Sequence, residues 1–164
     1  MENNRRWEKI NDKIYNLFIN DEKIGEMTID FKTLDTIFKT STAEFKTQRS
    51  GFWKSNIEVY DKDGKTIAKT STDKWYSHFS TLKYFEKKFR FEVRNNPMVE
   101  FAILDENETV LAYALSLENK QICINITSSV NNNDPVLDYL IWQSFHHIAN
   151  ENFGRNYIFT TKNS

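Results

Sequence analysis

The stretch Asp134-Pro-Val-Leu-Asp-Tyr-Leu-Ile-Trp-Gln-Ser-Phe-His-His-Ile-Ala-Asn150 decides how the rest of this chain must fold. Asp134 is a favourable N-cap and Pro135 a favourable first helical residue, so we predict a helix over residues 134–150. At about 100° per residue, its apolar side chains cover roughly two-thirds of the circumference. No Lys, Arg or Glu occurs within it after the cap. We therefore expect a helix that protein encloses on most sides.

The chain before this helix has the period of β-strands. Between Lys13 and Thr127, apolar and polar residues alternate in short runs, separated by turns such as Asp61-Lys62-Asp63-Gly64. The clearest predicted strand runs from Phe85 to Arg94. Strands this short and evenly spaced are typical of an antiparallel barrel or sandwich. Because the helix needs enclosure, we predict a mainly β barrel with the helix inside it.

The whole chain, residues 1–164, is predicted to be a single domain. We expect an N-terminal segment over residues 1–12, strands over residues 13–127 and the central helix over residues 134–150. Residues 153–164 follow the helix and are predicted to form either a tail or an edge strand.

Composition and charge exclude several classes of protein. The formal net charge of −1 gives no broad attraction to nucleic acid, so we expect no nucleic-acid partner. Cys123 is the single cysteine, which rules out an internal disulfide and fits a reducing compartment. The sequence shows neither an apolar run long enough to span a membrane nor a secretory signal, so we expect a cytoplasmic protein with no transmembrane segment.

The order of these elements resembles the tubby C-terminal-like superfamily, which includes the LURP-one-related proteins and is similar to phospholipid scramblases. The resemblance lies in the hairpins of Asn56–Thr70 and Val99–Leu117 and in the Asp-led apolar helix that follows them. It implies a closed antiparallel β-barrel of about twelve strands around a central apolar C-terminal helix. It also implies an association with membrane lipids, as a property of the class and without assigning particular residues.

A group of basic residues on the predicted strand Phe85–Arg94 is the first candidate site. Lys88, Arg90 and Arg94 fall on one face, near Lys83 and Lys87, and such a group suits an anionic headgroup or phosphate. Glu86 and Glu92 lie on the same face, however, and a solvated, cross-paired surface is the alternative interpretation.

The loop Arg49-Ser-Gly-Phe52-Trp53-Lys54 is the second candidate site. It places two adjacent aromatic residues between cations, which suits the interface of a membrane. A plug that closes one end of the barrel is the alternative interpretation of the same residues.

No pattern in the sequence singles out catalytic chemistry. Gly-rich phosphate loops, metalloprotease motifs, nucleophile elbows and paired cysteines are all missing, so we expect no cofactor and no metal. The predicted function is a non-enzymatic binding domain, by resemblance for anionic lipid or a membrane surface. A calycin-like barrel that carries a small apolar ligand and a protein-interaction scaffold remain the alternatives.

Overall fold

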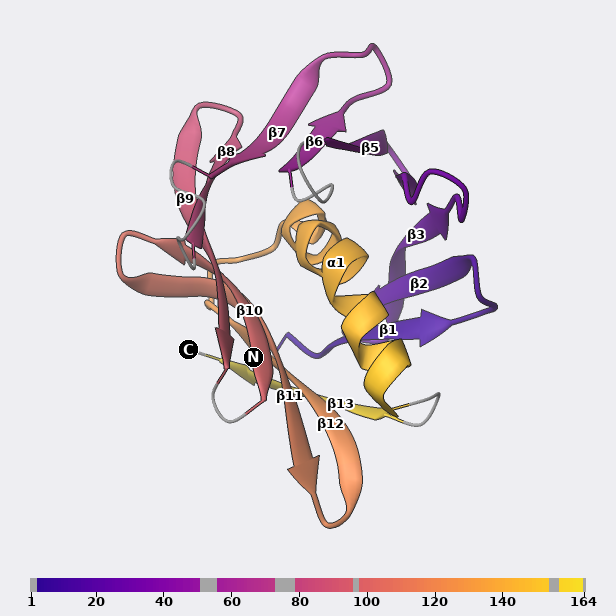
Figure 1. The fold of residues 1–164 in the computed structure, drawn as a ribbon, viewed down its shortest axis with the longest axis vertical. Coiled ribbons are helices and arrows are strands. Elements are labelled where there is room, and N and C mark those ends of the chain that lie inside the picture. Colours follow the sequence, from indigo (N-terminus) through magenta and orange to yellow (C-terminus); the bar gives the residue numbers. More distant parts are fainter. Residues whose placement is uncertain (1–2, 51–55, 73–78, 96–97, 154–156, 164) are drawn as a thin grey trace.

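A computed structural model of the chain describes residues 3–50, 56–72, 79–95, 98–153 and 157–163. It shows a mainly β protein in which thirteen strands follow one another around a nearly closed barrel, with the helix α1 among them (Figure 1). The strands are β1 (Arg5–Lys9), β2 (Ile14–Ile19), β3 (Glu22–Ile29), β4 (Thr36–Thr40), β5 (Glu44–Ser50), β6 (Asn56–Tyr60), β7 (Thr66–Ser71), β8 (Phe79–Tyr84), β9 (Lys87–Asn95), β10 (Val99–Asp105), β11 (Glu108–Glu118), β12 (Gln121–Ser128) and β13 (Tyr157–Asn163). The predicted fold class is confirmed.

The sheet is an antiparallel meander from β1 to β12, and its strand order is the order of the sequence. The last strand, β13, pairs in parallel with β12, because the chain crosses the barrel as α1 (Pro135–Phe153) before it returns. Thr161 of β13 then reaches β1, where its Oγ1 accepts a hydrogen bond from the Arg5 backbone N–H at 2.9 Å. This contact brings the two ends of the sheet together.

Three boundaries differ from those predicted, and the first is the end of the helix, which runs to Phe153 and not to Asn150. The N-terminal segment contains β1, which the sequence did not reveal because only Trp7 gives its five residues an apolar period. Phe85 does not begin a strand either. It lies in the turn between β8 and β9 with a φ of 51°, so the predicted strand Phe85–Arg94 is wrong in its first two residues. The segment after the helix forms an edge strand, one of its two predicted states.

The side chains of α1 fill the barrel. Tyr139, Ile141, Trp142 and Phe145 have no exposed surface, and the Trp142 ring stacks on Trp7 of β1 with centroids 5.5 Å apart. Burial of such large side chains contributes about 1.5–3 kcal/mol each. The helix therefore occupies the centre of the apolar core, as its lack of Lys, Arg and Glu between Val136 and Asn150 predicted.

The helix begins where its sequence predicted. The Asp134 Oδ1 accepts the backbone N–H of Val136 at 2.9 Å, which is the expected N-cap bond. One turn later, Asp138 is fully buried and pairs with the equally buried Arg5 of β1. The other oxygen of Asp138 accepts the Tyr113 hydroxyl at 2.7 Å. A carboxylate within the apolar helix thus joins it to two strands.

Candidate functional site

Three lysines form a continuous row across the outer face of β7, β8 and β9. Lys69 is the register partner of Lys83, and Lys83 is the partner of Lys88. All three are exposed, since the alternate residues Leu82 and Phe89 point into the core. We call Lys69, Lys83 and Lys88 the lysine row.

No ion pair neutralises the lysine row within the described residues. Among the residues that the structure describes, no carboxylate oxygen lies within 4.0 Å of these three ammonium groups. Glu58 is the register partner of Lys69 on β6, but its Oε1 accepts the Thr66 hydroxyl at 3.1 Å instead. Like charges placed directly opposite each other destabilise a sheet. The row therefore has a mutual repulsion that a bound anion would relieve.

The structure separates the predicted basic face of β9 into two parts. Lys88 belongs to the lysine row. Arg90 and Arg94 both approach Glu92, with Nε to carboxylate distances of 2.7 Å, and Arg94 also contacts Glu100 at 3.0 Å. The two arginines therefore already have intramolecular carboxylate partners, which is the alternative that the sequence left open for them.

Arg49, from the second predicted site, makes its contacts with the central helix. Its Nη2 donates to the Gln143 carbonyl oxygen at 2.9 Å and to the Ser144 hydroxyl at 3.1 Å. Burial lowers the pKa of the Arg49 guanidinium, and the contacts tie β5 to α1. The other predicted residues of this loop fall outside the described residues: Phe52, Trp53 and Lys54.

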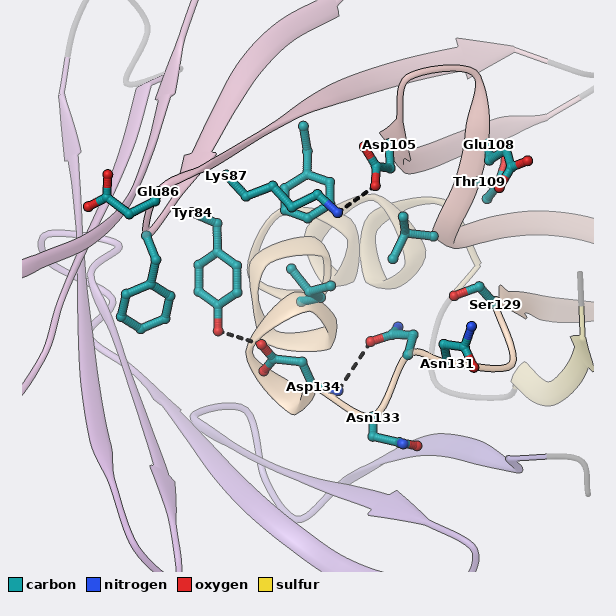
Figure 2. Close-up of a pocket in the computed structure, with 15 residues that line it drawn as sticks. Tyr84, Glu86, Lys87, Asp105, Glu108, Thr109, Ser129, Asn131, Asn133 and Asp134 are labelled. Atoms are coloured by element: carbon teal, nitrogen blue, oxygen red, sulfur yellow. Dashed lines mark hydrogen bonds and ion pairs between the residues drawn. The ribbon is translucent and has the colours of Figure 1, made fainter.

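A cavity of about 810 Å³ opens beside the N-terminus of α1, between the β8–β9 and β10–β11 turns (Figure 2). Phe89, Val110 and Leu137 contribute apolar surface to its lining. Figure 2 shows Lys87 extending across it toward Asp105, and the two groups form an ion pair at 2.5 Å. The volume falls within the range of small-molecule sites.

The polar lining of this cavity is acidic, and the helix end offers little to an anion. Four carboxylates line it, those of Glu86, Asp105, Glu108 and Asp134, against one amine. Tyr84 donates its hydroxyl to Asp134 at 2.5 Å, and the same carboxylate caps the helix. Since the cap already accepts the first available amide, an anion is better placed on the lysine row than here.

The sequence identified only one end of the lysine row directly. It placed Lys88 on a basic face and noted Lys83 nearby, whereas Lys69 lies fourteen positions before Lys83 and was missed. The local pattern was misleading, because Ile67 and Ala68 are both buried and strict alternation with Ile67 inward would have placed Lys69 inward too. The register between β7 and β8 could not be derived from the sequence either, because it depends on the length and path of their connection.

In comparisons with known proteins, no family model matches the chain, and no curated protein or solved structure matches it either. The resemblance to the tubby-like superfamily therefore stays a prediction. No helix in the described part of the chain is long and apolar enough to cross a bilayer. Within the same residues, no group of three or more His, Cys, Asp or Glu side chains is placed to hold a metal ion.

Proposed function

We propose that this protein is a non-enzymatic binding domain that docks on an anionic membrane surface through the lysine row. The observation that carries the proposal is the in-register alignment of Lys69, Lys83 and Lys88 with no carboxylate partner among the described residues. Clustered lysines are attracted to the negative surface of anionic lipid by about 1 kcal/mol each. Across neighbouring strands, they present their charge as a compact strip.

The filled barrel favours this surface over an internal carrier site. In a calycin-like protein, the ligand occupies the space between the strands. Here the fully buried side chains of Trp142, Phe145 and Tyr139 lie in that space. A ligand of this domain would therefore bind at the outside or at the mouth of the barrel.

Vesicle flotation with a matched pair of variants tests the proposal. The triple variant Lys69→Gln, Lys83→Gln, Lys88→Gln removes the row. Its control changes three exposed lysines elsewhere and so has the same net charge: Lys32→Gln, Lys120→Gln and Lys162→Gln. We expect the wild type to bind phosphatidylserine-containing vesicles at low salt and not vesicles of phosphatidylcholine alone.

The row variant should bind at least about tenfold more weakly than the wild type, and the control should lose much less. Added salt should weaken the wild type, because exposed charges are screened. Equal losses in both variants would mean that net charge alone matters. Failure of the wild type to bind anionic vesicles at low salt would overturn the proposal and leave the scaffold alternative, to be tested by capture of a protein partner.

A further inference from the structure

The turn that joins β8 to β9 holds an aromatic residue in an unfavourable backbone conformation. Phe85 has a φ of 51°, in the left-handed region that bulky side chains rarely adopt. Two other hairpin turns with positive φ begin with asparagine, at Asn20 and Asn119. Asparagine tolerates this region far better. The backbone of the β8–β9 turn is therefore more strained with phenylalanine at position 85 than it would be with asparagine.

The exposure of the apolar Phe85 side chain to water is also unfavourable. Its side chain is 54% exposed, although it lies beside a core with many aromatic rings. Its backbone N–H donates to the Ile67 carbonyl oxygen at 2.8 Å, and the Tyr84 ring lies 4.8 Å from its own. Tyr84 is in turn fixed by its hydrogen bond to Asp134. These two hydrogen bonds therefore hold the turn in place while the Phe85 ring stays exposed.

The lysine row begins directly beside this turn. Lys83 and Lys88 are register partners two residues before and three residues after Phe85. Phe85 and Lys83 line one small hollow on the outer surface with Lys69, and Glu58 and Glu86 line it as well. An exposed apolar ring beside the three lysines of the row suits an anionic lipid surface, with headgroups for the lysines and an apolar layer for the ring. It does not suit a second copy of this chain, because two such faces would bring the same lysines together.

We propose that Phe85 is the membrane-inserting residue of this domain, entering the boundary between headgroups and acyl chains while the lysine row contacts the headgroups. This inference rests on the proposed function. It gives the strained turn a physical reason, since the exposure of the ring in the free protein becomes favourable burial in the bound state. It also adds to the charge attraction a component that salt does not screen.

Phe85→Asn tests the inference, with Leu34→Asn as its control. Leu34 also has a positive φ, 62°, and is an exposed apolar residue, but it lies in the β3–β4 turn. Connections of an antiparallel meander alternate between the two ends of the barrel, which puts Leu34 at the end opposite Phe85. Each substitution should raise the melting temperature, because asparagine relaxes the backbone.

The two variants should differ in binding. In flotation with phosphatidylserine-containing vesicles, Phe85→Asn should bind about tenfold more weakly than the wild type, whereas Leu34→Asn should bind as the wild type does. The loss for Phe85→Asn should persist at higher salt. Phe85→Trp should bind at least as tightly as the wild type, since tryptophan favours membrane interfaces.

The outcomes separate this inference from the function on which it rests. Anionic binding by the wild type with no loss in Phe85→Asn overturns the role of Phe85 and leaves the lysine row standing. Equal losses in Phe85→Asn and Phe85→Trp also overturn insertion. If the wild type itself fails to bind anionic vesicles, both proposals are overturned.

Discussion

The inside of the barrel and the outer face of β7–β9 differ in whether their charged side chains form ion pairs. Inside, the fully buried Arg5 pairs with Asp138, which lies 133 positions away in the sequence. Outside, the lysine row has no carboxylate partner among the described residues. Even Glu58, the register partner of Lys69, bonds to the Thr66 hydroxyl and not to the lysine. The difference therefore suggests that the lysines are kept free for a partner that brings the negative charge.

Removing one member of the buried ion pair should change the free energy of unfolding more than any other substitution considered for the two regions. Arg5→Met leaves the Asp138 carboxylate in the core without its counter-ion, and we expect the free energy of unfolding to fall by about 3–5 kcal/mol. Urea unfolding at neutral pH measures it. The control is Arg6→Met, which removes a half-exposed pair with Asp21 and should lower the same quantity by less than about 1 kcal/mol.

The double variant Arg5→Met, Asp138→Leu sharpens the same test. Because it removes both charges, it should recover most of the stability that Arg5→Met loses. If the double variant is as unstable as the single one, packing around Arg5 rather than the orphaned charge is what matters.

The pH dependence of stability should show the next largest effect. Burial raises the pKa of Asp138 from its ordinary 3.8 to about 6, against the opposing effects of Arg5 and the Tyr113 hydrogen bond. A raised pKa means that the folded state holds the proton more tightly. The contribution of the raised Asp138 pKa to the free energy of unfolding is therefore fully present below about pH 4, and it is lost as the pH rises to about 6. A pKa change of this size corresponds to about 3 kcal/mol.

Urea unfolding from about pH 4 to about pH 7 checks this, with the double variant Arg5→Met, Asp138→Leu as reference. The free energy of unfolding of the wild type minus that of the variant should fall by about 3 kcal/mol across the range. His146 also titrates abnormally, since burial lowers its pKa to about 3, but it is present in both proteins and cancels. A difference that stays constant with pH would show that Asp138 remains ionised throughout.

The two regions also differ in how much of each could be predicted from sequence. The helix could be predicted, because a run of residues without Lys, Arg or Glu has only one stable place in a β protein. Its partner Arg5 could not, since nothing local marks an arginine of a short first strand as buried. Nothing local marks Asp138 as the partner of this arginine either, and the pairing became visible only when β1 and β11 were placed beside the helix.

For the outer surface, the sequence predicted which charged residues lie on β9. It did not predict which residues of neighbouring strands lie beside them. The sequence indicated that carboxylates dilute the basic face of β9, and Glu92 does lie between Arg90 and Arg94. It could not align Lys69 with Lys83, because pairing between strands depends on the path of a connection whose residues carry no period. The turn at Phe85 was misread since an aromatic residue at a strand's edge normally belongs to the strand, and positive φ leaves no mark in sequence.

The smallest expected effect on stability is also the finest test of the outer surface. Glu92→Gln frees Arg90 on the strand that carries Lys88 and leaves Arg94 with Glu100 alone, and the loss of partly exposed ion pairs should lower the free energy of unfolding by less than about 1 kcal/mol. If this face meets anionic lipid, the released Arg90 and the removal of the Glu92 charge should raise the affinity for phosphatidylserine-containing vesicles about threefold or more.

The matched control for this last change is Glu26→Gln, which frees Lys23 on β3 and alters the net charge by the same amount. Vesicle flotation at low salt compares the two variants directly. A gain confined to Glu92→Gln would show that intramolecular pairing on β9 limits the binding surface. An equal gain in both would mean that the membrane responds to the charge of the whole molecule, and the contrast between a paired interior and an unpaired lysine row would then carry no functional meaning.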